Sequence, residues 1–179
     1  AAGGEVIWQL CGGGAAEGTN AYATIGDTDV SVSGRAAYAF AGGAARGGGR
    51  SEVVGVSRIA LEAEGASSVA LFGGGLAEGD ASAYRTEDSV VSVAGTAAWV
   101  FGGDYAFGRG AAKLSGTASV TILPGASVAE LYAGSFATDE GSVAEIASAK
   151  IAGSERAERY RPGSVSSKGG FAEDPEIGG

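Results

Sequence analysis

Residues 69–79 read Val-Ala-Leu-Phe-Gly-Gly-Gly-Leu-Ala-Glu-Gly, and residues 89–95 read Ser-Val-Val-Ser-Val-Ala-Gly. The second stretch alternates with a period near 2, which is typical of a β-strand. Three glycines interrupt the first stretch, and glycine at this density would cost a helix up to about 1 kcal/mol per residue relative to alanine. The pattern therefore predicts a strand over 69–72, a glycine bend, and further strands over 81–85 and 90–94.

The same pattern recurs along the chain, with one large apolar residue before each glycine bend. These anchor residues are separated by 30, 32, 29 and 31 positions. Self-similarity at a period of about 30 residues indicates a repeat protein. We expect stacking to create a structural ladder of Leu10, Phe40, Phe72, Phe101 and Tyr132. Beside it we expect a glycine column of Gly12, Gly42, Gly74, Gly103 and Gly134, and an alanine column of Ala15, Ala45, Ala77, Ala106 and Ala137.

These repeats predict an all-β protein in which residues 1–153 form five units of about 30 residues. The units would stack as a β-solenoid or as β-arches, which are two strand layers joined by a bend. Antiparallel hairpins are a third arrangement that the pattern allows. Neighbouring strands lie about 4.8 Å apart, so that equivalent residues contact one another. Cys11 stands in a column of small residues and is expected to pack as a small apolar group.

The repeat pattern stops at Ser154, and the segment 154–179 differs in composition. Nine of its 26 residues are charged, four basic and five acidic. One interpretation is a solvated C-terminal tail. The other is a docking arm that covers a sheet edge or contacts a neighbouring subunit, with candidate subunit contacts at Arg156, Arg159, Tyr160, Arg161 and Phe171.

The composition argues against several functional classes. The chain has 179 residues, 12 Lys+Arg against 21 Asp+Glu (12 − 21 = −9), no histidine and one cysteine. Without histidine there is no Ser-His-Asp triad and no histidine metal site. An acidic chain lacks the basic face that nucleic-acid binding needs, and no stretch approaches the roughly 18 apolar residues of a membrane-spanning helix. We therefore expect no enzymatic activity, no cofactor, no nucleic-acid partner and no membrane span.

The strand pattern begins at Val6, directly after five residues, with no amphipathic capping helix before it. An uncapped solenoid presents unpaired backbone groups with which another chain can pair. We therefore expect a homopolymer, a structural protein that assembles through its sheet edges into a fibre, sheath or surface layer. The alternative is a fragment whose caps have been removed. Few Asn, Gln, Met, His or Cys residues means few sites for deamidation or oxidation, which suits a secreted or cell-surface protein.

Three other functions stay open from the sequence. Rings of Trp8, Tyr38 and Trp99, each two residues before an anchor, would stack on sugars and make the chain a carbohydrate-binding module. Carboxylates near the bends would suit calcium, at Asp27/Asp29, Glu62/Glu64, Glu87/Asp88 and Asp139/Glu140. A polysaccharide-acting enzyme needs two carboxyl groups at a defined separation, and no pair stands out.

The runs at 69–79 and 89–95 resemble the glycine-rich repeats of prokaryotic β-solenoid surface proteins and adhesins. The resemblance covers residues 6–153. The Gly/Ala-rich, self-stacking units also look like the β-arch proteins that form the sheath of filamentous methanogenic archaea. That resemblance implies a resistant, amyloid-like extracellular tube without enzymatic activity. The sorting motif and separate binding domain of an adhesin are not visible in the sequence, which favours self-assembly over adhesion.

Overall fold

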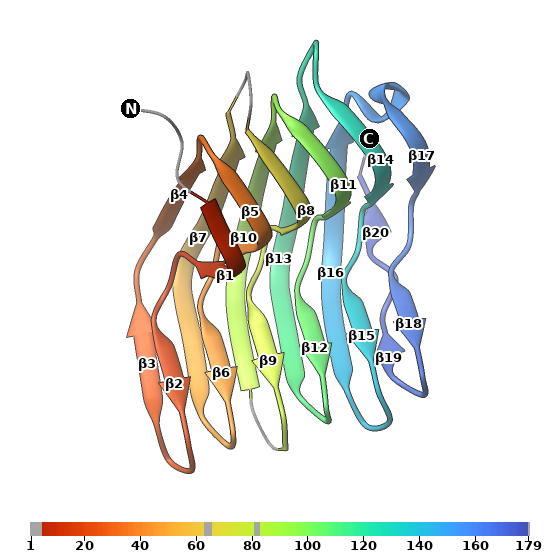
Figure 1. Cartoon of the computed structure of the whole chain (residues 1–179). Coiled ribbons are helices and arrows are strands. Elements are labelled where there is room, and N and C mark those ends of the chain that lie inside the picture. Colours follow the sequence, from red (N-terminus) through yellow and green to blue (C-terminus); the bar gives the residue numbers. More distant parts are fainter. Residues whose placement is uncertain (1–4, 63–65, 81–82, 179) are drawn as a thin grey trace.

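The chain winds into six stacked coils of β-strand in the computed structural model, which describes residues 5–62, 66–80 and 83–178 (Figure 1). Strands of successive coils pair in parallel and build three sheets. The fold is therefore an all-β parallel solenoid. Parallel pairing throughout the described strands rules out the hairpin arrangement.

The sheets take one strand or strand pair from each coil. Sheet A consists of β1 (Glu5–Cys11), β5 (Arg35–Phe40), β8 (Ser67–Phe72), β11 (Thr96–Phe101), β14 (Ser127–Tyr132) and β17 (Ala157–Arg161). Sheet B consists of β2 (Ala15–Glu17), β6 (Ala44–Arg46), β9 (Leu76–Glu78), β12 (Tyr105–Phe107), β15 (Phe136–Thr138) and β18 (Val165–Ser167). Sheet C consists of β3 (Tyr22–Ile25) and β4 (Thr28–Val32), β7 (Arg50–Leu61), β10 (Ala83–Val93), β13 (Ala111–Ile122), β16 (Val143–Ala152), and finally β19 (Phe171–Ala172) and β20 (Glu176–Ile177).

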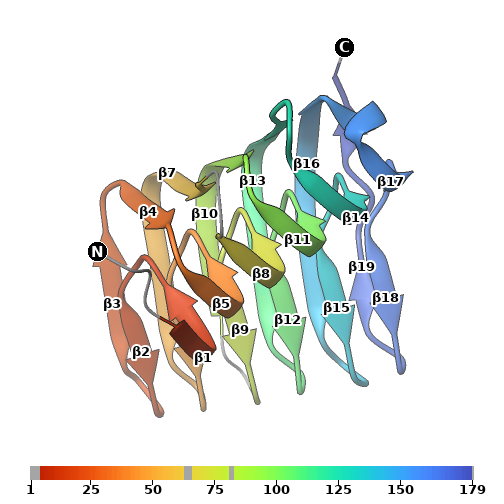
Figure 2. The same ribbon diagram turned by 45° about the horizontal axis from the view of Figure 1, so that its top comes forward.

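Each coil has two layers. Sheets A and B lie one beyond the other in the first layer, and the long strands of sheet C form the second (Figure 2). The strand expected over 69–72 corresponds to β8. The strands expected over 81–85 and 90–94 correspond to the two halves of β10, which a register shift interrupts after Thr86, while residues 81 and 82 lie outside the described residues. The three-residue strand β9 was not expected, because its glycine-rich surroundings mask so short an alternation.

Two main apolar clusters fill the space between the layers, and a third, of Leu114, Ala118, Ala133, Ile146 and Ala149, lies between sheet C and the bend at Ala133. The larger lies between sheets A and C, where Leu71 and its neighbours meet Ile59 and the other β-branched residues of sheet C. The smaller lies between sheets B and C and consists mostly of alanine. Tyr84 is the largest side chain of this cluster. The Tyr84 ring packs against the bend between β5 and β6, so closely that a Cβ added at Gly42 would overlap the Tyr84 hydroxyl.

The aromatic ladder lies outside this interior. Leu71 faces sheet C, so the next residue, Phe72, points to the opposite side of sheet A, into the elbow between sheets A and B. Centroid distances of 4.9, 4.8 and 4.6 Å separate successive stacked rings of Phe40, Phe72, Phe101 and Tyr132. Tyr105 and Phe136 of sheet B stack alongside them. Four of the five expected ladder residues are therefore confirmed as one continuous stack.

The first unit lies one residue away from the expected register. β1 pairs with β5 so that Leu10 lies beside Ala39 and Cys11 lies beside Phe40. Leu10 therefore belongs to the interior row, and the assignment of Leu10 to the ladder was wrong. Cys11 is the first rung instead, half-buried against the aromatic cluster, where burial raises the pKa of its thiol. Its packing as a small apolar group is as expected.

The glycine column shows the same shift. Gly13, not Gly12, lies in the column of Gly42, and its N–H donates to the Gly42 carbonyl at 3.0 Å. In the same way Ala16, not Ala15, pairs with Ala45. Beyond the first unit the column is as expected, because the same amide-to-carbonyl bond then links Gly42, Gly74, Gly103, Gly134 and Gly163.

The described part of the charged segment, residues 154–178, is a sixth coil and not a tail outside the repeat. After a 3₁₀ turn at Ser154–Arg156, β17 pairs with β14, β18 with β15, and both β19 and β20 with β16. In this coil Arg161 takes the ladder position beside Tyr132, and Ser166 takes the alanine position beside Ala137. The division into a five-unit domain and a separate tail is therefore corrected to six coils.

Candidate functional site

The candidate site consists of the two ends of the stack. Within the described ranges, β1–β4 pair toward the second coil alone, and β17–β20 pair toward the fifth coil alone. We call β1–β4 the N-terminal edge and β17–β20 the C-terminal edge. Figure 1 places them at opposite ends of the molecule. Their outward N–H and C=O groups can pair with strands of another chain.

The N-terminal edge combines an apolar rim with carboxylates. Leu10 closes the end of the larger interior cluster and is only half-buried there. On sheet C the side chain of Tyr22 is 62% exposed and Ile25 is also exposed. Glu5 on sheet A and Glu17 on sheet B are exposed acids. The sheet A and B side of this edge therefore carries negative charge around an apolar centre.

The C-terminal edge has an apolar centre of its own. Tyr160 lies in register with Leu131, a residue of the interior row, and its ring is partly exposed at the open end. Phe171 on β19 is 58% exposed, and Ile177 on β20 is exposed as well. An edge with exposed aromatic residues and a free strand side favours contact with another surface.

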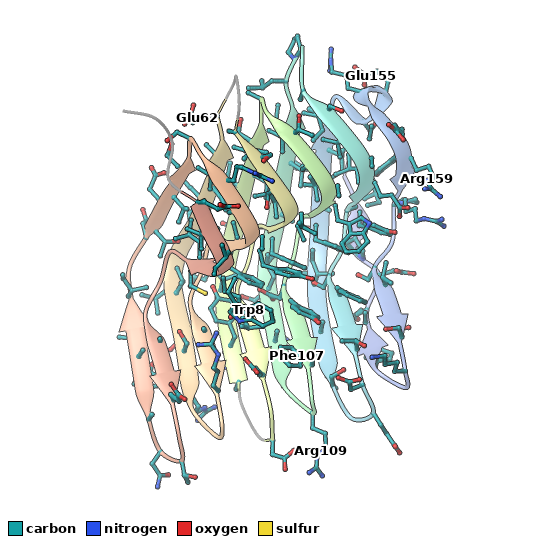
Figure 3. The ribbon with its side chains drawn as sticks, in the orientation of Figure 1. Trp8, Glu62, Phe107, Arg109, Glu155 and Arg159 are labelled. Atoms are coloured by element: carbon teal, nitrogen blue, oxygen red, sulfur yellow. The ribbon has the colours of Figure 1, made fainter. Side chains whose placement is uncertain are left out.

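Basic residues surround this centre on the side of sheets A and B. Arg156 pairs with Glu155 at 2.7 Å, and Arg159 pairs with Glu130 at 3.0 Å (Figure 3). Arg161 is exposed at the end of β17, and Lys168 follows β18. All five residues expected to contact another subunit, Arg156, Arg159, Tyr160, Arg161 and Phe171, therefore lie on this one edge. Their matching residues on the N-terminal edge, Glu5, Glu17 and Tyr22, were missed because they align only when the coil register is known.

Ion pairs between neighbouring coils follow a common pattern. Arg46 pairs with Glu78 at 2.8 Å, and Lys113 pairs with Glu145 at 2.7 Å. In each case the two residues are register partners on adjacent strands. Exposed pairs of this kind stabilise by about 0–1 kcal/mol each, so they select register more than they stabilise the fold.

A column of side-chain acceptors links the bends of the last coils. The Gly75 N–H donates to Asp104 Oδ1 at 2.8 Å, and the Asp104 N–H donates to Ser135 Oγ at 3.0 Å. The Ser135 N–H donates to Ser164 Oγ at 2.8 Å, and the Ser164 N–H donates to Asp174 Oδ1 at 2.6 Å. Asp174 therefore covers the bend of the sixth coil, while the strands beside it keep a free side.

Asp104 is fully buried in this column. Its Oδ2 has no hydrogen-bond partner among the described residues, although Oδ1 accepts the Gly75 amide. Burial raises the pKa of this carboxyl to about 7, against the lowering effect of the amide. Burial raises the pKa of the Tyr84 hydroxyl, and the nearby Asp104 raises it further. The carboxyl lies inside the molecule, so it is a structural group and has no exposed face for a substrate.

The proposed sugar-stacking residues do not form one row. Trp8, which Figure 3 labels, is 68% exposed, and Trp99 of β11 is 41% exposed. The register partner of Tyr38 in the first coil is Gln9, and Ala70 separates Tyr38 from the column position of Trp99. Trp8 meets Tyr38 edge-on, with centroids 6.4 Å apart. The structure thus leaves two separate exposed indoles on one face.

The carboxylates near the bends do not gather into a metal site. The described part of the chain contains no group of three or more His, Cys, Asp or Glu side chains placed to hold a metal ion. Asp27 accepts the Val56 N–H and pairs with Arg58, which hold the pKa of its carboxyl below the usual value. Glu64 of the acidic pair at 62 and 64 lies outside the described residues.

Comparisons with known proteins give no match. No protein-family model matches the chain, and neither a curated protein nor a solved structure matches it. No helix within the described ranges has the length and apolar character required to cross a bilayer. The structure shows the class of fold, a parallel β-solenoid, and the two edges are the features of this fold that bear on its function.

Proposed function

We propose that this protein is a structural subunit that assembles through its two edges into an extracellular fibre, sheath or surface layer. The observation that carries the proposal is the free side of every strand in the first and sixth coils of the described chain. A second copy can extend each sheet by the same parallel hydrogen bonds that join the coils internally. The repeated Gly/Ala bends and the low content of oxidisable side chains support a long-lived extracellular material.

The resemblance to prokaryotic glycine-rich surface proteins and methanogen sheath proteins supports the same assignment. The parallel solenoid found here is one of the two architectures that the resemblance implies. Under this proposal the protein is a homopolymer of the sheath or surface-layer type, with no enzymatic role.

Tyr160 offers a direct test because it lies at the open end of the interior row. We expect Tyr160→Lys to stay monomeric at concentrations at which the wild-type chain forms polymers, because a charge would then be buried in the joint. Tyr160→Leu is the matched control and should still assemble, since its register partner in the interior row, Leu131, is also a leucine. Sedimentation velocity over a concentration series distinguishes the variants. A wild-type chain that stays monomeric at millimolar concentration would contradict the proposal.

Glycan binding is a second candidate, favoured by the exposed indoles of Trp8 and Trp99 on one face of sheet A. Under this candidate the chain is a carbohydrate-binding solenoid or a piece of an adhesin. Tryptophan fluorescence should then shift when soluble glycans are added, and Trp8→Ala with Trp99→Ala should abolish binding without changing the fold. Unchanged fluorescence across a panel of acidic and neutral polysaccharides would count against it.

A further inference from the structure

We propose that copies of this chain join head to tail, with the C-terminal edge of one copy on the N-terminal edge of the next. The joint continues the parallel register by which neighbouring coils pair within the chain. This inference rests on the proposed function and specifies its partner as a second copy, with one polarity and one set of residue pairs. Three features of the two edges support it.

The first feature is charge complementarity on sheet A. One interior column runs from Val6 through the four intervening coils to Ala157. Extended by one coil, it sets Ala157 beside Val6 of the next copy. The residues that precede these two are Arg156 and Glu5, so a base meets an acid. Glu5 already approaches Arg35 of its own second coil at 3.9 Å, so it would lie between two arginines.

The second feature is the same complementarity on sheet B. One column contains Glu17, Arg46, Glu78, Phe107, Thr138 and Ser167. Ser167 therefore lies beside Glu17 of the next copy, with the Lys168 ammonium one residue away. Arg46 lies on the other side of Glu17 as its register partner. The joint repeats the alternation of acid and base already present between Arg46 and Glu78.

The third feature is apolar complementarity. Phe171 and Tyr22 occupy the same column of sheet C at opposite ends of the stack, and both rings are largely exposed. Tyr160 likewise shares its column with Leu10. Head-to-tail stacking buries both pairs together. Two columns oppose the joint. Glu176 would face Asp27, and Arg161 would enter the apolar column that ends at Cys11.

Like-to-like joints lack these pairs. On the side of sheets A and B, two C-terminal edges would bring together Arg156, Arg159, Arg161 and Lys168, with Glu155 and Glu158 as the acids of that side. Two N-terminal edges would bring Glu5 and Glu17 together. Like charges that are placed opposite one another destabilise strand pairing. A head-to-tail contact is heterologous and does not close, so it generates a filament. Six coils at about 4.8 Å give an axial repeat of about 29 Å per subunit.

Cysteine cross-linking tests the register. In a Cys11→Ala background, the variant Glu17→Cys with Ser167→Cys places two thiols on adjacent strands at a spacing that a disulfide can span. We expect oxidation to give a ladder of disulfide-linked multimers. The matched control is Glu17→Cys with Ser166→Cys, because Ser166 occupies the interior column of Ala137 and its side chain points to the other face. This control should give at least tenfold less multimer.

The outcomes separate the joint from assembly itself. A multimer ladder in the 17/167 pair, weak in the 17/166 pair, supports the head-to-tail register. Polymers visible by electron microscopy without that ladder would overturn the register and leave self-assembly standing. Covalent dimers from Glu17→Cys alone would overturn the polarity, since they require two N-terminal edges in contact. Absence of polymers from the wild-type chain at all concentrations would overturn the proposed function and the joint together.

Discussion

Asp104 occupies a position in the bend between sheets A and B that is glycine in the first three coils and carries a polar side chain from the fourth coil onward. Gly14, Gly43 and Gly75 precede it in the earlier coils, and Ser135 and Ser164 follow it. A carboxylate oxygen can accept a hydrogen bond from the backbone N–H of the preceding coil, as the serine hydroxyls do. Unlike a hydroxyl, it also brings a charge into a fully buried site. Asp104 thus accepts one hydrogen bond, but its ionised form lowers the stability of the folded chain because the charge is buried.

The buried carboxyl group of Asp104 predicts that the free energy of unfolding depends on pH. The pKa of Asp104 is about 7 when folded, against about 4 for an unfolded aspartate. As pH rises from about 4 to about 7, the unfolded chain releases this proton and the folded chain retains it, so the free energy of unfolding falls through this window and levels off above it. Below about pH 4 both states are protonated and the contribution is constant.

Asp104→Asn tests this directly. We expect the variant to lose the pH dependence that Asp104 contributes and to raise the free energy of unfolding at pH 8 by about 1–3 kcal/mol. That gain is less than the roughly 4 kcal/mol that corresponds to a pKa raised from about 4 to about 7, because the asparagine side chain brings unpaired N–H groups into the buried site. Urea denaturation at pH 4, 6 and 8 measures it. Equal destabilisation of the variant at all three pH values would contradict the buried-charge explanation.

At the scale of the element, the bend between β5 and β6 depends on glycine for space. Gly42 lies directly under the Tyr84 ring, which is fully buried and cannot move aside. We expect Gly42→Ala to destabilise the fold by about 1–3 kcal/mol through overpacking. Gly26, between β3 and β4, has open space around it, so Gly26→Ala is the matched control and should be near neutral. Thermal unfolding of the two variants compares them, and equal losses would refute a packing role for the bend.

The sequence was sufficient to predict strands, their stacking and most of the columns. From Phe40 onward, an aromatic residue, a glycine two positions later and an alanine five positions later fix the register without ambiguity. In the first coil they do not, because Gly12, Gly13 and Gly14 are consecutive and Ala15 is followed by Ala16. Either alignment satisfies the pattern there. Hydrogen bonding chooses the one that places Cys11 beside Phe40.

The sixth coil could not be recognised from the same columns. Arg161 replaces the aromatic rung and Ser166 replaces the alanine, while Gly163 alone keeps its identity. Both substitutions are tolerated in the isolated chain because the sixth coil has a neighbour on one side, so that an arginine there can reach solvent. For the candidate site, the sequence identified the C-terminal edge by its charge. It predicted an uncapped N-terminal edge beginning at Val6, but it did not identify the acids of that edge, which are scattered over 13 positions from Glu5 to Glu17.

At the scale of the whole molecule, stability is built from contacts between neighbouring coils. In such a stack each coil contributes its own term and one interface term with each neighbour. The head-to-tail joint reuses that interface, including backbone pairing, acid–base alternation and continuation of the apolar interior. A subunit and its polymer are then held by the same kind of contact, and the polymer protects the strand edges that the isolated chain exposes.

X-ray fibre diffraction from aligned assemblies of the full-length chain tests self-assembly through the coil ends most directly. The coil axis should coincide with the filament axis, which predicts a meridional reflection near 4.8 Å and an axial subunit repeat of about 29 Å. A 4.8 Å reflection on the equator would mean that the molecules associate through their sides and not through their edges. A concentrated solution that yields neither filaments nor the reflection would contradict the assignment as a structural polymer.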